Sequence, residues 1–168
     1  TDIKKCYSNS TIPAAAAMMH VTGDFNLSTL IRNANFFGYE KVFYVGGKKS
    51  YDRRGTVGTH NYIDVDFIKT EEEFLSRIRE IGYMPIAIEN NVNYNCINLY
   101  DFDFDTTFLF EKPVFIFGEE QKGLSNYMLD NCDLIITIPA RGTVRSLNVG
   151  TASGIVLGHY SQYFLDVN

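Results

Sequence analysis

Residues 114–125 read VFIFGEEQKGLS, and residues 134–149 read LIITIPARGTVRSLNV. Each stretch begins with a short apolar run rich in β-branched or aromatic residues, which is typical of a parallel strand buried on both faces. A glycine and a helix-like segment follow each run. Because ligands bind outside the carboxyl ends of strands in open α/β sheets, we expect the two loops to form the floor of one pocket.

The first loop does not match a phosphate-binding loop. A dinucleotide fingerprint requires G-x-G-x-x-G, whereas Glu120 stands in the place of the second glycine. A carboxylate there would repel a phosphate but would accept a neutral or cationic ligand. The alternative is that both loops are ordinary turns between a strand and a helix, with Ser146 as a helix N-cap.

Length and composition predict one globular domain, residues 1–168, with 45% hydrophobic and 21% charged residues. No apolar run approaches the roughly 18 residues of a membrane span, so we expect no membrane partner. The three cysteines are widely spaced and form no CxxC or Cys/His pattern. This spacing indicates neither a disulfide framework nor a metal site, and it favours a cytoplasmic protein.

The net charge of −5 at first disfavours a nucleic-acid partner. However, eleven acidic and only three basic residues fall between Asp64 and Glu111, which leaves twelve basic and nine acidic residues in the rest of the chain. Local charge decides where a polyanion can dock. The residues that we expect to contact RNA are Lys48, Lys49, Arg53, Arg54 and Arg145.

Hydrophobic periodicity predicts alternating strands and helices. Strands are expected at 14–21, 41–45, 84–88, 114–117 and 134–138, and helices at 27–37, 71–81, 125–130 and 147–165. The basic segment 48–61 has no period and is interpreted as a long surface loop, which is often functional. Residues 101–105 alternate like an edge strand.

Three stretches resemble the SpoU (TrmH) family of RNA ribose 2′-O-methyltransferases, of the SPOUT superfamily. The first has Arg32 six residues after Asn26 and Gly38 six residues after Arg32. The second is the Phe117–Ser125 loop, and the third runs from Ile138 to Ala152. Their order and internal spacing agree with the family.

The resemblance implies a SPOUT α/β-knot, a mostly parallel sheet flanked by helices with a C-terminal trefoil knot. It also implies S-adenosylmethionine as methyl donor, an RNA substrate and a homodimer. By position in the family motifs, the residues expected to bind the donor are Ile88, Glu89, Phe117, Gly118, Ile138 and Leu147.

The resemblance also assigns the catalytic role to Arg32, surrounded by a polar shell. Arginine is a poor proton acceptor at neutral pH because its pKa exceeds 12. It is better suited to stabilise negative charge on the 2′-oxygen, with an RNA phosphate or solvent taking the proton. The other members of the expected polar shell are Asn26, Glu120, Ser146 and Asn148.

The sequence therefore predicts an RNA 2′-O-methyltransferase that acts on tRNA. An rRNA 2′-O-methyltransferase is the first alternative. A catalytically silent SPOUT domain that only binds RNA is the second.

Overall fold

The computed structural model describes residues 11–20, 25–46, 63–90, 93–107, 111–119 and 122–165. Seven strands form one sheet in the order β3-β2-β1-β6-β4-β7-β5, with parallel pairing between neighbours. The strands are β1 (Ile12–Met19), β2 (Tyr39–Val45), β3 (Asp64–Ile68), β4 (Tyr83–Ile88), β5 (Ile97–Asn98), β6 (Lys112–Phe117) and β7 (Leu134–Thr137). The helices are α2 (Phe25–Phe36), α3 (Glu71–Glu80), α4 (Phe104–Thr107), α5 (Asn126–Asn131) and α6 (Val149–Ser161), with 3-10 turns η3 (Leu99–Asp101) and η4 (Gln162–Phe164).

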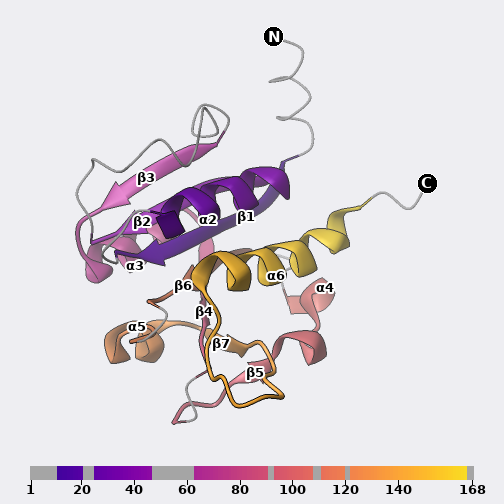
Figure 1. Cartoon of the computed structure of the whole chain (residues 1–168). Coiled ribbons are helices and arrows are strands. Elements are labelled where there is room, and N and C mark those ends of the chain that lie inside the picture. The colour runs from indigo at the N-terminus through magenta and orange to yellow at the C-terminus, as the bar shows by residue number, and fades with distance from the viewer. Residues whose placement is uncertain are drawn as a thin grey trace.

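Helices cover both faces of the sheet, with α2 and α6 side by side on one of them (Figure 1). Alternate residues of the central strand β1 enter different cores, because successive side chains of a strand point to opposite faces. Ala16 packs in the core that contains α2 and α6, whereas Ala17 packs in the core that contains α3 and α5. The predicted α/β class with a mostly parallel sheet is confirmed. The trefoil knot stays a prediction.

Small residues of α6 allow close packing on α2. A Cβ at Gly150 would lie 2.7 Å from Cγ2 of Thr29, and one at Gly158 would lie 3.0 Å from the ring of Phe37. Asn33 of α2 donates to the carbonyl of Gly150 at 3.0 Å. A surface of small residues also suits a helix of a second subunit, but here its partner is α2 of the same chain, so it is not evidence for a dimer.

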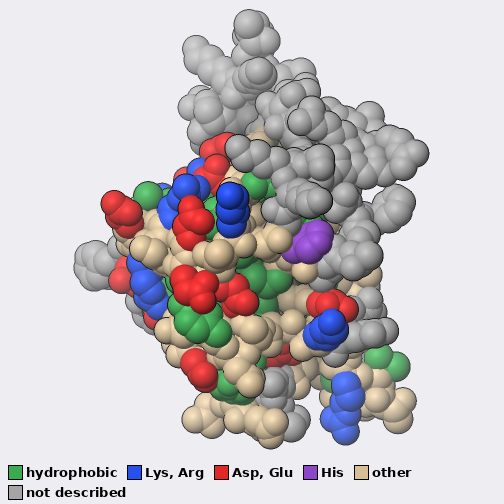
Figure 2. Space-filling model, turned by 90° about the vertical axis from the view of Figure 1, so that its left-hand side faces the viewer, with side chains coloured by type: hydrophobic (Ala, Val, Ile, Leu, Met, Phe, Trp, Pro, Cys, Tyr) green, Lys and Arg blue, Asp and Glu red, His purple; other side chains and the backbone are tan. Residues whose placement is uncertain are grey.

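The β1–β3 arrows in Figure 1 point toward the carboxyl edge of the sheet, and Figure 2 views the molecule from that side. Acidic, basic and hydrophobic side chains are interspersed on the coloured part of this surface, where no continuous basic patch is visible. On this face, the described side chains therefore form no basic docking surface for a polyanion.

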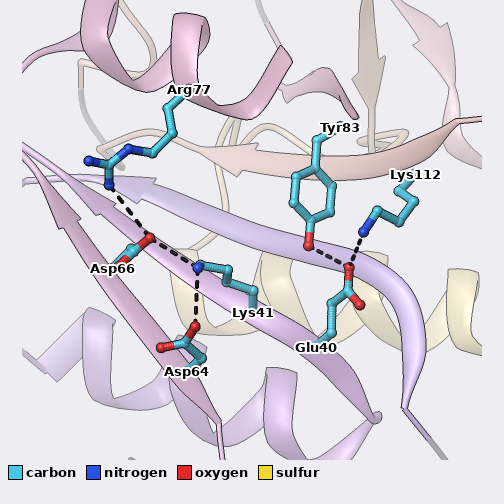
Figure 3. A network of polar contacts seen from close by, with 7 residues as sticks. All are labelled: Glu40, Lys41, Asp64, Asp66, Arg77, Tyr83 and Lys112. Atoms are coloured by element: carbon cyan, nitrogen blue, oxygen red, sulfur yellow. Dashed lines mark hydrogen bonds and ion pairs between the residues drawn. The ribbon is translucent and has the colours of Figure 1, made fainter. Parts of the chain in front are cut away.

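Strand β3 was not expected, because its acidic residues hide the strand pattern. Lys41 of β2 lies 3.1 Å from Asp64 and 3.0 Å from Asp66. Arg77 of α3 lies 3.6 Å from Asp66, and Figure 3 shows this network. These ion pairs let an acidic segment join a sheet edge.

The expected edge strand at 101–105 is wrong. This segment contains the end of η3 and the start of α4. Phe104 is only 2% exposed, and its ring centroid lies 6.1 Å from that of Phe115 and 5.2 Å from that of Tyr160. The alternation of Asp and Phe in this segment therefore reflects a buried Phe104 at the start of a short helix, and not a strand. Helix α6 ends at Ser161, followed by η4, and is therefore shorter than expected. None of the helices in the described ranges is long and apolar enough to cross a membrane.

Candidate functional site

A cavity of about 280 Å³ opens where β4, β6 and β7 end. Its size is just below the lower end of the roughly 300–1,000 Å³ range of ligand pockets. Three chain segments wall it: residues 88–90, the loop after β6 and the loop between β7 and α6. The lining residues are Ile88, Glu89, Asn90, Phe117, Gly118, Glu119, Lys122, Gly123, Ile138, Arg145, Ser146, Leu147, Val149 and Ala152.

The loop after β6 folds back on itself at two glycines. The N–H of Gly123 donates to the carbonyl of Glu119 at 2.6 Å. A Cβ at Gly118 would lie 2.5 Å from the carbonyl carbon of Gly123 and 2.6 Å from the amide nitrogen of Leu124. Gly123 has a φ of +66°, a left-handed conformation that glycine adopts without penalty. The two glycines of the second motif thus shape one wall of the cavity.

The first and third motifs meet beside the cavity. Asn148 is the N-cap of α6, where its side-chain oxygen accepts from the N–H of Gly150 at 2.8 Å. Its Nδ2 donates to Oδ1 of Asn26 at 3.3 Å. Asn148, and not Ser146, therefore caps this helix, and the same side chain also joins α2 to the loop.

The structure brings together all six residues predicted to bind the donor, since each of them lines this cavity. Ser146, predicted to be catalytic, and Arg145, predicted to contact RNA, line it as well. Asn26 and Asn148 are joined beside it. Five predicted site residues lie outside the described ranges: Lys48, Lys49, Arg53, Arg54 and Glu120.

Arg32 occupies a different position. Its side chain is exposed on α2, and it is not among the described residues that line the cavity. A direct role in a reaction within this cavity therefore requires another surface to bring the guanidinium there.

Several lining residues were not predicted. Asn90 follows Glu89 directly, so the end of β4 was a signal for it. Gly123 belongs to the second motif, where its fixed spacing from Gly118 was already visible. Lys122 carried no signal, because a lysine in a polar loop looks like any solvated side chain.

Charges of both signs face the cavity. The acidic lining residues are Glu89 and Glu119, and the basic ones are Lys122 and Arg145. Burial and the neighbouring Glu89 carboxylate raise the pKa of the Cys96 thiol, which keeps it protonated and unsuited to nucleophilic attack. Within the described part of the chain, no group of three His, Cys, Asp or Glu side chains is placed to hold a metal.

A second cavity, of about 400 Å³, lies at the same edge of the sheet, beyond β1, β2 and β3. None of the predicted site residues within the described ranges lines it. Its lining residues are Met19, His20, Val45, Gly46, Lys69, Thr70, Glu71 and Glu72.

Comparisons with known families and sequences cover the part of the chain that contains the three motifs. The sequence model of the SpoU rRNA Methylase family matches residues 14–158. A tRNA (guanosine(18)-2′-O)-methyltransferase of Aquifex aeolicus is 27% identical over 142 residues, 82% of this chain and 64% of that protein. A 23S rRNA (guanosine-2′-O-)-methyltransferase of Pseudomonas aeruginosa is 26% identical over 151 residues, 87% of this chain and 57% of that protein. The chain thus spans about three fifths of the length of these curated relatives.

Solved structures show the same fold. The TrmH/SpoU tRNA modifying enzyme of A. aeolicus superposes with a TM-score of 0.78 at 20% identity, covering 96% of this chain and 84% of that one. An AdoMet-bound rRNA methyltransferase of Sinorhizobium meliloti gives a TM-score of 0.78 at 24% identity, covering 91% of this chain and 57% of that one.

Proposed function

The chain belongs to the SpoU rRNA methylase family, and we propose that it transfers a methyl group from S-adenosylmethionine to a ribose 2′-hydroxyl of RNA. The observation that carries the proposal is that all six residues expected to bind the donor line one cavity. Relatives named for both tRNA and rRNA leave two substrates. We propose tRNA first and rRNA as the alternative, in a cytoplasmic enzyme.

The lining of the cavity suits this donor. Ile88, Phe117 and Leu147 offer apolar surface of the kind that holds an adenine ring. The cationic side chains of Lys122 and Arg145 can pair with the carboxylate of an amino-acid tail. When bound, S-adenosylmethionine supplies an electrophilic methyl group on a sulfonium cation and carries no phosphate, which agrees with a loop that lacks a phosphate-binding fingerprint.

Methyl transfer places two demands on the protein. The ribose 2′-oxygen must approach the methyl carbon in line with the carbon–sulfur bond that breaks, and the hydroxyl proton must leave. Ser146 lines the cavity and Asn148 lies two residues further on, joined to Asn26. These polar groups can orient a ribose at the mouth of the cavity, because hydroxyl and amide groups both donate and accept hydrogen bonds.

Arg32 would act on the RNA rather than on the donor. A guanidinium beside a phosphate can hold the nucleotide and stabilise negative charge on the 2′-oxygen. The proton then passes to a phosphate oxygen of the RNA or to water, because arginine itself stays protonated.

A homodimer would supply Arg32 in trans. The exposed side chain of Arg32 and its absence from the described lining support this arrangement. We expect an Arg32→Ala subunit mixed with a Ser146→Ala subunit to regain part of the activity, since one composite site would be intact. Ser146 is preferred to Asn148 for this test because Asn148 also caps α6.

Two preparations of Arg32→Ala mixed together provide the control, and native mass spectrometry confirms subunit exchange. Heterodimers that form without regaining activity would place the whole site in one chain.

The methyl-transfer assay uses donor with a labelled methyl group and separate tRNA and rRNA fractions. Alkali cleaves RNA through the free 2′-oxygen, so a 2′-O-methyl group protects the adjacent phosphodiester. The proposal predicts label in alkali-resistant dinucleotides. Label only in the mononucleotides that alkali releases would indicate base methylation instead. RNA binding without any methyl transfer would favour the silent-domain alternative.

A further inference from the structure

The end of β4 lies between the two loops that wall the cavity. Glu89 continues the line of the strand, since its N–H donates to the carbonyl of Ile136 at 3.0 Å. Its carboxylate is directed toward the loop after β6. Oε2 accepts from the N–H of Leu124 at 2.7 Å, and Oε1 accepts from the N–H of Asn90 at 3.1 Å.

The loop after β6 packs directly on this carboxylate. A Cβ at Gly123 would lie 2.3 Å from Oε2 of Glu89. The absence of a side chain at Gly123 therefore creates the space that the carboxylate occupies. The backbone of Leu124 also packs closely against Gly118, which lines the cavity. The position of Leu124 therefore fixes the position of the Gly118 wall, the part of the cavity lining that Gly118 forms.

Asn90 holds the other loop. Its Nδ2 donates to the carbonyl of Arg145 at 3.2 Å. Its Oδ1 accepts a hydrogen bond from Oγ1 of Thr137, the last residue of β7. The hydroxyl of Thr137 thus orients the amide so that its NH₂ group faces the loop. Arg145 directly precedes Ser146 and Leu147, which line the cavity.

We propose that Glu89 and Asn90 are positioning residues, which hold the two loops on either side of the cavity at a fixed separation. This inference rests on the proposed function, since it names how the donor site is kept in shape. Glu89 acts on the donor through Leu124 and the Gly118 wall, and Asn90 acts through Arg145 and the residues after it. Two adjacent residues on a rigid strand can preorganise a site that is otherwise built on loops.

The affinities for two ligands distinguish a positioning role of Glu89 from a direct contact between its carboxylate and the donor. S-adenosylmethionine is cationic at sulfur, whereas its product S-adenosylhomocysteine is neutral there. A positioning role predicts that Glu89→Ala weakens both ligands equally, by about 10- to 100-fold, the range expected for loss of a hydrogen bond to a charged group. Glu89→Gln keeps one acceptor oxygen and should weaken both ligands less.

Calorimetric titration measures these affinities, with Glu80→Gln on α3 as the matched control. A loss confined to the cationic ligand in both Glu89 variants would overturn the positioning role and assign a direct electrostatic contact. Unchanged affinity for both ligands would overturn it too. Wild-type protein that binds neither ligand would instead refute the proposed donor site.

A double-mutant cycle tests Asn90 independently of Glu89. Thr137→Val removes the hydroxyl while keeping the shape of the side chain, and Asn90→Ala removes the link to Arg145. If Thr137 acts only through Asn90, the double variant should bind donor as weakly as Asn90→Ala alone. Asn131→Ala, which removes a 2.8 Å hydrogen bond to Tyr127 on α5, is the control and should bind normally.

The same variants are examined by amide hydrogen exchange without ligand. Asn90→Ala should speed exchange at Ser146 and Leu147, and Glu89→Ala should do so at Leu124, each relative to Asn131→Ala. Additive losses of affinity in the double variant, or unchanged exchange in folded variants, would overturn the inference.

Discussion

Alanine in place of Gly118 should deform the cavity, because its Cβ would meet backbone atoms. The nearest is the carbonyl carbon of Gly123 at 2.5 Å, which is about 1 Å short of carbon–carbon van der Waals contact. Since a backbone segment cannot rotate away like a side chain, the loop after β6 must shift. Overpacking of this kind costs about 1–3 kcal/mol of unfolding free energy. For a domain of this size the melting temperature should fall by roughly 3–9 °C.

Donor binding should suffer with stability, because the displaced loop forms one wall of the cavity. We expect an affinity loss of at least about tenfold, equivalent to about 1.4 kcal/mol. The matched control is Gly142→Ala in the loop between β7 and α6, where no atom of the described residues lies within 4 Å of an added Cβ. Thermal unfolding and calorimetric titration with S-adenosylmethionine compare the two variants. Equal melting temperatures and equal affinities for Gly118→Ala and Gly142→Ala would refute the steric reasoning.

Three further predictions concern other parts of the chain. Arg32→Ala should abolish methyl transfer while donor affinity and melting temperature stay normal, because the side chain is exposed on α2; single-turnover rates near those of wild type would remove Arg32 from the mechanism. Alanine at the four basic residues of segment 48–54 should weaken RNA binding. It should also flatten the slope of log affinity against log salt concentration by up to about 3. An unchanged slope would show that these four side chains make no phosphate contacts. These residues are Lys48, Lys49, Arg53 and Arg54. Burial raises the pKa of the Cys132 thiol to about 12, compared with about 8.5 for a cysteine in an unfolded chain. Above about pH 8.5 the unfolded chain loses this proton while the folded protein keeps it. The contribution of Cys132 to the free energy of unfolding is therefore complete below about pH 8.5 and is lost as the pH rises toward 12. Denaturant unfolding between pH 8 and 10 should therefore show a shallower pH dependence for Cys132→Ala than for wild type, and parallel profiles would contradict this.

Strands with strong apolar runs could be predicted because burial on both faces leaves a continuous signal. The expected strands at 114–117 and 134–138 correspond to β6 and β7, with boundaries within two residues. Strand β3 gave no such signal, since Asp64 and Asp66 are stabilised by Lys41 and Arg77 from other elements. Partners that distant in sequence cannot be identified from local pattern.

The site divides in the same way. The motif glycines at 118 and 123 marked the right loop, but their mutual contact and the carboxylate of Glu89 beneath Gly123 depend on the folded backbone. Asn33 illustrates the same limit on α2. It carried no motif signal, yet its amide donates at 2.9 Å to the buried hydroxyl of Ser153 on α6.

We expect S-adenosylmethionine to occupy the cavity at the ends of β4, β6 and β7. The most direct measurement is a crystal structure of the chain grown with S-adenosylhomocysteine or S-adenosylmethionine. Ligand density is expected between residues 88–90, the loop after β6 and the loop that carries Leu147. Ligand density in the cavity beyond β1–β3, with the predicted site empty, would contradict it.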